Sequence, residues 1–225
     1  MTSDSFAWAW LGRVRYGRAL ALQEELRRRI LDGEGGDTLL LLEHEPVVTL
    51  GRHADPANVL LPKDALAASG VEVVETTRGG DVTYHGPGQL VGYPVFRLRR
   101  GVVDFLETLG AALTDVCAGL GVRLSFCRQP AGLWVGNEKL VAFGLHVHRD
   151  VSIHGFALNA RTPLEAFRAI VPCGLRAAGV TSLARQCGPG APAPAELAPG
   201  VAAALARVLG RPAAPVVPEA LWDLL

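Results

Sequence analysis

The sequence lacks an excess charge of either sign, a long apolar run and a cysteine framework. Lys+Arg and Asp+Glu number 22 each in 225 residues, so no overall field draws the chain to nucleic acid or an anionic membrane. No apolar stretch reaches the roughly 18 residues of a membrane span. The N-terminal residues also do not show the basic segment followed by an apolar stretch that is typical of a secretory signal. The four cysteines have no metal-type C-x-x-C spacing and are sparse for a disulfide scaffold. We therefore expect a soluble, reduced, cytoplasmic protein that binds neither nucleic acid nor membrane.

Lysine is scarce as well. Only Lys63 and Lys139 occur, whereas arginine occurs 20 times. A lysine can give up its proton in a protein and an arginine cannot, so a retained lysine hints at a position where a guanidinium does not serve. Lys139 opens a predicted strand in which Val141 and Phe143 share its face, and a lysine heading an apolar row is partly desolvated and suited to proton transfer. The alternative, an ammonium in water at a hairpin end, stays open.

The pattern of apolar residues predicts one domain over residues 1–225. With 49% hydrophobic residues, the chain can fill a sizeable core and is not dominantly disordered. We predict helices over 16–33, 62–70, 103–120 and 201–209, strands over 38–42, 71–75, 90–98, 122–127, 132–135, 139–148 and 151–159, and a loop over 186–200. Strands and helices do not alternate strictly, which favours an α+β fold with a mixed β-sheet.

The segment Arg78-Gly-Gly-Asp-Val-Thr-Tyr-His-Gly-Pro-Gly-Gln89 concentrates residues with chemical potential. Gly79 and Gly80 allow the backbone to approach a ligand without interference from a Cβ. Arg78 is suited to pair with a carboxylate or phosphate, and His85 to hydrogen-bond or transfer a proton. The composition alone favours this interpretation no more than a turn-rich connection between two strands.

A second candidate is Cys173, held between Pro172 and Gly174. We expect irregular backbone there to leave its sulfur accessible, although a free cysteine is by default a small buried hydrophobe. An ammonium favours the thiolate, which is the nucleophilic form, so Lys139 and Cys173 would form a nucleophile–base pair if the fold brought them together. His146, His148 and His154 suggest a metal site only weakly, because a third ligand is unplaced and no carboxylate pattern accompanies them.

Four segments in this order resemble the lipoyl(octanoyl) transferase family. They are residues 78–89, Lys139-Leu-Val-Ala-Phe-Gly144, His154-Gly-Phe-Ala-Leu-Asn159 and Pro172-Cys-Gly174, and the resemblance extends from Trp10 to about Leu183. It implies a fold similar to the catalytic domain of biotin and lipoate protein ligases. It also implies transfer of an octanoyl or lipoyl group from acyl carrier protein to a lysine of lipoyl domains, in lipoate biosynthesis and protein lipoylation, without cofactor or metal. The acceptors would be the lipoyl domains of 2-oxo acid dehydrogenases and the glycine cleavage H protein.

The resemblance also assigns residues. Cys173 would form the acyl-thioester, and Lys139 would lower the pKa of its thiol. The acyl pocket would be lined by Arg78, Gly79, Gly80, Asp81, Val82, Thr83, Tyr84, His85, Ala142, Phe143, Gly144, Gly155, Phe156 and Ala157. His146 and His148 are not part of the family pattern. An acidic carrier would dock on Arg97, Arg99 and Arg100, or alternatively on residues 27–29, unless these are ordinary solvated charges.

Other functions remain as alternatives. An ATP-dependent lipoate ligase on the same fold would need phosphate recognition but no cysteine nucleophile. A related enzyme would use the cysteine to move octanoate between lipoyl domains, and an inactive carrier-binding protein would lack the site residues. The presence of Cys173 and of the segment that ends at Gln89 favours the transferase.

Overall fold

The computed structural model describes residues 5–172 and 179–225, so Cys173 and Gly174 lie outside the described residues. The helices are α1 (Tyr16–Asp32), α2 (Lys63–Ala68), α3 (Val102–Gly119), α4 (Leu183–Cys187), α5 (Pro194–Leu209) and α6 (Pro218–Trp222), with 3₁₀ turns η1 (Pro56–Asn58) and η2 (Leu164–Ala169). The strands are β1 (Phe6–Val14), β2 (Thr38–His44), β3 (Val47–Leu50), β4 (Glu72–Glu75), β5 (Val82–His85), β6 (Gln89–Val95), β7 (Ser125–Arg128), β8 (Ala131–Val135), β9 (Glu138–His148), β10 (Val151–Asn159), β11 (Gly179–Val180) and β12 (Ala213–Pro215).

The strands form a large mixed sheet and a small one. The large sheet has the order β12-β1-β2-β6-β10-β9-β8-β7, with β11 beside β9, and the small sheet has the order β4-β3-β5. Pairing of β1 with β2 is parallel, whereas β6, β10, β9 and β8 pair antiparallel. The predicted α+β fold with a mixed sheet is therefore confirmed.

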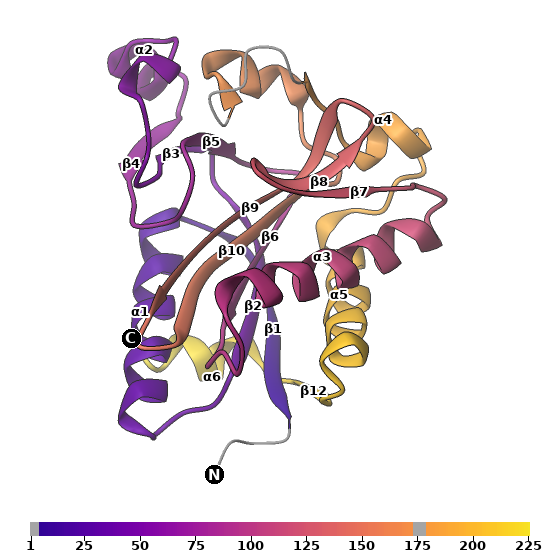
Figure 1. Cartoon of the computed structure of the whole chain (residues 1–225). Helices are drawn as coiled ribbons and strands as arrows, with labels where there is room; N and C mark the ends of the chain where they lie inside the picture. Colours follow the sequence, from indigo (N-terminus) through magenta and orange to yellow (C-terminus); the bar gives the residue numbers. More distant parts are fainter. Residues whose placement is uncertain (1–4, 173–178) are drawn as a thin grey trace.

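Helices cover both faces of the large sheet, as Figure 1 shows: α3 and α5 lie on one side and α1 on the other. Strand β2 reads as a continuous apolar run because both of its faces are covered. Leu39 and Leu41 pack toward α3 and α5, whereas Leu40 and Leu42 pack toward α1. In α1 the buried residues Ala19, Leu22, Leu26 and Ile30 recur at intervals of three and four, as in the helix predicted over 16–33. The helix is capped by Gly33, whose φ of 79° suits a glycine.

Two parts of the prediction were wrong or incomplete. The loop predicted over 186–200 ends at Ala193, because α5 begins at Pro194 rather than at residue 201. Proline is accommodated in the first helical turn, where its missing N–H has no partner to lose. Several elements were not predicted at all, although β3 and β5 hold part of the site described below: they are β1, β3, β5, β11, β12, α4 and α6.

No helix within residues 5–172 and 179–225 has the length and apolar character needed to cross a membrane.

Candidate active site

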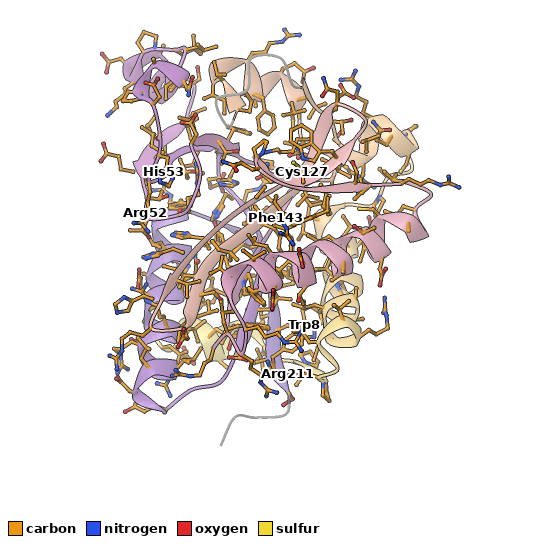
Figure 2. All side chains as sticks on the ribbon, in the orientation of Figure 1. Trp8, Arg52, His53, Cys127, Phe143 and Arg211 are labelled. Atoms are coloured by element: carbon orange, nitrogen blue, oxygen red, sulfur yellow. The ribbon has the colours of Figure 1, made fainter. Side chains whose placement is uncertain are left out.

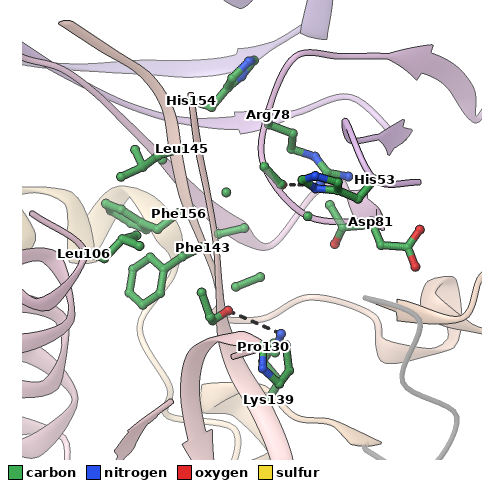
Figure 3. A pocket seen from close by; sticks show the side chains of 18 of the residues that line it. His53, Arg78, Asp81, Leu106, Pro130, Lys139, Phe143, Leu145, His154 and Phe156 are labelled. Carbon is green, nitrogen blue, oxygen red and sulfur yellow. Dashed lines mark hydrogen bonds between the residues drawn. The ribbon is translucent and has the colours of Figure 1, made fainter. Parts of the chain in front are cut away.

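A cavity of about 410 Å³ lies where the small sheet, the β9–β10 hairpin and the start of α3 meet (Figure 3). Its volume is in the range of ligand pockets, roughly 300–1,000 Å³. Most residues expected from the sequence to bind substrate line it: Arg78, Gly79, Gly80, Asp81, Thr83, His85, Ala142, Phe143, Gly144, Gly155, Phe156 and Ala157, together with Lys139. The apolar part of the wall extends onto α3 through Val102 and Leu106. The fold thus gathers segments far apart in the sequence around one space.

Val82 and Tyr84 do not share this position. Side chains alternate along β5, so Thr83 and His85 face the cavity while Val82 and Tyr84 point to the opposite side. There the ring of Tyr84 packs edge-on against Phe167, with centroids 5.6 Å apart. These two residues belong to the small apolar cluster behind the site, which corrects the expectation that they line the pocket.

Lys139 lies on a different face of β9 from the one predicted. Gly132 pairs with Ala142 and Trp134 pairs with Lys139, so β9 holds one residue more than β8 between these pairs. This β-bulge interrupts the alternation of side chains. Lys139 therefore does not share the face of Val141: its Cε is 3.0 Å from the place where a Cβ of Gly132 would lie, on the side of Ala142. The bulge turns the lysine from the core toward the cavity.

The surroundings of Lys139 are enclosed. The residue is 6% exposed, which confirms the predicted desolvation. Its Nζ donates to the Ala131 carbonyl at 3.4 Å and lies 4.8 Å from the ring centroid of Trp134. Lys139 also lines a second, small cavity of about 20 Å³, together with Pro172 and Val180. The described chain on both sides of residues 173–178 thus borders the same space as the ammonium.

Arg78 is buried and its guanidinium is engaged with the protein itself. Nε donates to the Thr49 hydroxyl at 2.9 Å, Nη2 to the Thr49 carbonyl at 2.5 Å and Nη1 to the Gly79 carbonyl at 3.1 Å. These bonds fix the loop 78–81 on β3. Gly144 permits the approach on the other side, because a Cβ there would lie 2.9 Å from the Gly79 carbonyl oxygen. The segment therefore requires its glycines at least partly for close backbone packing.

The carboxylate of Asp81, like the guanidinium of Arg78, forms hydrogen bonds with other residues of the protein. Its carboxylate accepts from the backbone N–H of Asp55 at 3.0 Å and from the side-chain amide of Asn58 at 2.5 Å. The loop that Asp81 holds continues into residue 59, which bridges to Ile170. Asp81 thus connects the cavity wall to the chain that leads toward Pro172.

A hydrogen-bonded network joins His85 to the strand of Lys139. The Gln89 amide nitrogen donates to Asn159 Oδ1 at 2.9 Å and to the Tyr84 carbonyl, which leaves Gln89 Oε1 as the acceptor for His85 Nδ1 at 2.7 Å. His85 therefore carries its proton on Nδ1. Asn159 donates to the Thr181 carbonyl, and the Thr181 N–H donates to the Lys139 carbonyl at 3.0 Å.

One wall of the cavity belongs to a cluster of buried aromatic side chains whose grouping the sequence did not reveal. Its members are Tyr16, His44, His85, Tyr93 and His154, and their rings are stacked, tilted or edge-on to one another. Burial lowers the pKa of His44 to about 4. Burial, followed by the charge of Arg78, lowers the pKa of His154 to about 3, and the pKa of His85 is held well below its usual value by burial, His44 and Arg78. These imidazoles are neutral at pH 7.

Tyr16, His154 and Tyr93 also line the main cavity, as do Leu145 and the loop 129–131. Their partners lie far away in the chain: the Tyr93 hydroxyl donates to His44 Nε2 at 2.6 Å, and Tyr16 lies against His154. Tyr16 begins a helix and Tyr93 lies in an apolar strand. The local sequence around each therefore predicts a side chain packed in the core and gives no indication that it lines the cavity. For Gln89 and Asn159 a signal existed, because each ends one of the segments that resemble the family.

Within the described part of the chain, no group of three or more His, Cys, Asp or Glu side chains is placed to hold a metal ion. His154 instead faces Thr77 through Nε2 at 3.1 Å and Tyr16 through Nδ1 at 3.5 Å. Among the described cysteines, burial raises the pKa of the Cys117 thiol to about 12, and Cys127 and Cys187 do not line the cavity.

The arginines considered for docking differ in their surroundings. Arg97 donates through Nη2 to the Ile30 carbonyl at 2.8 Å and through its backbone N–H to Asp37 at 2.7 Å, so it secures the end of α1. Arg99 and Arg100 are exposed, and only Gly101 separates Arg100 from Val102 at the cavity. The alternative surface on α1 is compensated by acidic neighbours, since Arg27 pairs with Glu24 and Arg28 with Glu25 and Asp32.

Comparison with known proteins agrees with this arrangement. Residues 15–205 match the lipoyl protein ligase A/B catalytic domain family. An octanoyltransferase of Koribacter versatilis is 45% identical over 189 residues, covering 79% of this chain and 74% of that protein. One of Mycobacterium leprae is 47% identical over 186 residues, covering 79% and 77%. One of Myxococcus xanthus is 46% identical over 187 residues, but the chain spans only about half, 52%, of that longer protein.

Solved structures show the same fold at low identity. A lipoate-protein ligase A bound with ATP superimposes with a TM-score of 0.78 at 15% identity, covering 99% of this chain and 93% of that one. Biotin protein ligase from Aquifex aeolicus, in complex with biotin and ATP, gives 0.54 at 14% identity, covering 91% and 70%. The sequence relatives and the shared fold lead to one conclusion: the chain belongs to the lipoyl protein ligase A/B catalytic-domain family and, within it, to the octanoyltransferases.

Proposed function

We propose that the chain transfers an octanoyl group from acyl carrier protein to the lysine of lipoyl domains through a thioester on Cys173. The supporting observation is the position of Lys139: this buried residue lines the apolar main cavity and also the small second cavity that Pro172 and Val180 border. An apolar cavity suits an alkyl chain, and a charge at its wall suits a reaction that forms and consumes a thiolate. The acceptors under this proposal are the lipoyl domains of 2-oxo acid dehydrogenases and the glycine cleavage H protein.

The chemistry balances with Lys139 as the only proton carrier. In the first step the Cys173 thiolate, stabilised by the Lys139 ammonium, attacks the carrier thioester, and the departing carrier thiolate takes the proton from that ammonium. In the second step the neutral acceptor amine attacks the Cys173 thioester. It loses its proton to the neutral Lys139, and the Cys173 thiolate departs. The enzyme returns to its starting state, and neither ATP nor a metal enters the balance.

Intact-mass spectrometry tests the thioester. The wild-type chain and Cys173→Ser are mixed with octanoyl acyl carrier protein without ATP, and the adduct is treated with hydroxylamine. We expect an octanoyl adduct on the wild-type chain that hydroxylamine removes, and no such labile adduct on the serine variant. Addition of a lipoyl domain should then move the octanoyl group to its lysine. Labelling of the lipoyl domain only when free octanoate and ATP are supplied would identify a ligase instead.

The carrier surface gives a second prediction. Arg99→Glu/Arg100→Glu should raise the Michaelis constant for octanoyl acyl carrier protein about tenfold and reduce its dependence on salt, because exposed charges at the rim of an interface mainly steer association. Arg97 is left unchanged because its bonds hold α1. The control is Arg123→Glu/Arg207→Glu, which makes the same charge change at exposed arginines, one beyond the C-terminal end of α3 and one on α5. An equal effect of both pairs would reject this docking surface.

A further inference from the structure

We propose that Trp134 is a positioning residue for octanoyl transfer: its ring face holds the Lys139 ammonium at the cavity and thereby sets the rate at which the acyl-enzyme forms. This inference rests on the proposed roles of Lys139 and Cys173. It assigns a task to a side chain that does not line the main cavity.

The geometry of the β8–β9 hairpin brings the two side chains together. Strand β9 of this hairpin carries two residues that line the cavity, Phe143, which is labelled in Figure 2, and Lys139, which is labelled in Figure 3. Trp134 and Lys139 are directly opposite each other across the two strands, at the bulge that turns Lys139 toward Ala142. Lys139 Nζ lies 4.8 Å from the Trp134 ring centroid, within the distance of about 6 Å at which a ring face attracts a cation. Gly132, without a side chain, leaves room for the lysine stem. The indole therefore forms one wall of the ammonium site.

The indole N–H indicates that this site uses the face of the ring. Trp134 is 9% exposed, and its Nε1 has no hydrogen-bond partner among the residues that the structure describes. An unsatisfied buried donor destabilises a fold, and a phenylalanine would avoid it. Indole, however, attracts a cation better than any other aromatic side chain does. The indole N–H therefore destabilises the fold at this position, whereas the ring face attracts the Lys139 ammonium.

A neutral ring has an advantage over a carboxylate in this place. It attracts the ammonium of Lys139, which the proposed reaction needs before the first step and forms again in the second. It does so without accepting the proton, so the lysine stays free to pass it on. Weakening the ring face should therefore slow formation of the acyl-enzyme while leaving the cavity and the binding of carrier unchanged.

Fluorinated tryptophans at position 134 test the proposal, because fluorine withdraws electrons from the ring face and changes its shape little. Tryptophan with zero to three fluorines is introduced at this position alone. Single-turnover acylation of Cys173 by octanoyl acyl carrier protein is then followed by intact mass, and the urea midpoint of each protein is measured. We expect the logarithm of the acylation rate to fall steadily with the number of fluorines, by between about twofold and thirtyfold in total. The urea midpoint should not follow the series.

Two variants complete the test. Trp134→Phe should show intermediate acylation with undiminished stability, and Trp134→Leu should acylate more slowly still. The matched control is fluorination at Trp222, whose ring lies 4.2 Å from the guanidinium carbon of Arg18 and does not line the cavity. Fluorine there should leave acylation unchanged.

The outcomes separate this proposal from the one on which it rests. A wild-type adduct on Cys173, together with acylation rates that are flat across the fluorinated series, would overturn the role of Trp134 alone. Rates that follow the urea midpoint rather than the number of fluorines would also overturn it, since they would show a purely structural role. No adduct on the wild-type chain would overturn the proposed function and this inference together.

Discussion

Replacing Lys139 with methionine is expected to lower the rate of octanoyl transfer by about 10²- to 10⁴-fold, the usual contribution of a proton-transferring side chain. Methionine keeps an unbranched apolar stem but carries neither charge nor proton. Both proposed steps would suffer, because the Cys173 thiolate loses its ammonium and the acceptor amine loses its base. Steady-state transfer from octanoyl acyl carrier protein to a lipoyl domain measures the effect.

The fold should tolerate this change. Lys139 is 6% exposed, so folding removes its ammonium from water, and an apolar side chain of similar length avoids that cost. The contacts given up include a hydrogen bond of 3.4 Å to the Ala131 carbonyl and the contact with Trp134. We expect urea unfolding of Lys139→Met to stay within about 1 kcal/mol of the wild-type chain. If Lys139→Met lost much stability, its slow transfer could result from partial unfolding. The variant Lys139→Arg would then decide whether Lys139 takes part in the reaction.

Lys139→Arg distinguishes charge from proton transfer. A guanidinium supplies the positive charge that favours the thiolate, but it does not release its proton. The variant should therefore form some acyl-enzyme and turn over slowly, so that an octanoyl adduct accumulates in intact-mass spectra when a lipoyl domain is present. Transfer as fast as that of the wild-type chain would show that Lys139 does not carry the proton.

The sequence predicted those parts of the site whose signal is local. The glycine-rich segment contains Arg78 and His85 within eight residues, which marked both as candidates. Both line the cavity, on β5 and the loop before it, although β5 itself was not predicted. The apolar stripe of α1 is readable because the period of a helix repeats over four turns. Cys173 was assigned by resemblance and lies outside the described residues, so its role stays a prediction.

The parts that the sequence did not predict depend on distant partners or on a single extra residue. Strand β3, whose Thr49 holds Arg78, is four residues long and follows another strand so closely that no pattern separates them. The bulge at β9 cannot be recognised from the alternation of apolar and polar residues in the sequence. Leu140 and Val141 are both apolar, and both pack into the core. A one-residue offset reverses the face of a strand, so the side chains predicted beside Lys139 were those of the opposite face.

Acidification is expected to destabilise the protein steeply between pH 7 and pH 5, because two histidines are buried in neutral form. Burial lowers the pKa of His44 to about 4 and, with Arg78, that of His154 to about 3, whereas an unfolded histidine has a pKa of about 6.5. Below pH 6.5 these two histidines therefore bind protons in the unfolded chain but stay neutral in the folded chain. Stability is fully present above pH 6.5 and is lost as the pH falls toward the folded values.

The size of this effect follows from linkage. Each histidine removes about 1.4 kcal/mol per pH unit below about pH 6.5, where the unfolded chain is protonated, so the two together remove about 4 kcal/mol between pH 7 and pH 5. His85 acts in the same direction, because its pKa is also lowered by burial. Since small domains are stable by roughly 5–15 kcal/mol, the loss is a large fraction of the total. Urea unfolding at intervals of half a pH unit measures it.

The substitution that isolates one histidine is His154→Asn. His154 has a φ of 58°, in the left-handed region that asparagine adopts more readily than most residues, so this change removes the imidazole with little backbone strain. It gives up the contacts with Thr77 and Tyr16 and should lower stability at pH 7, but the decisive quantity is the slope. Between pH 7 and pH 5 the variant should lose about 2 kcal/mol less than the wild-type chain.

The control His148→Asn, at an exposed position, should keep the wild-type slope because that imidazole is hydrated in both states. If His154→Asn also kept it, His154 would not contribute to the slope, and its imidazole would have to accept a proton without unfolding of the chain.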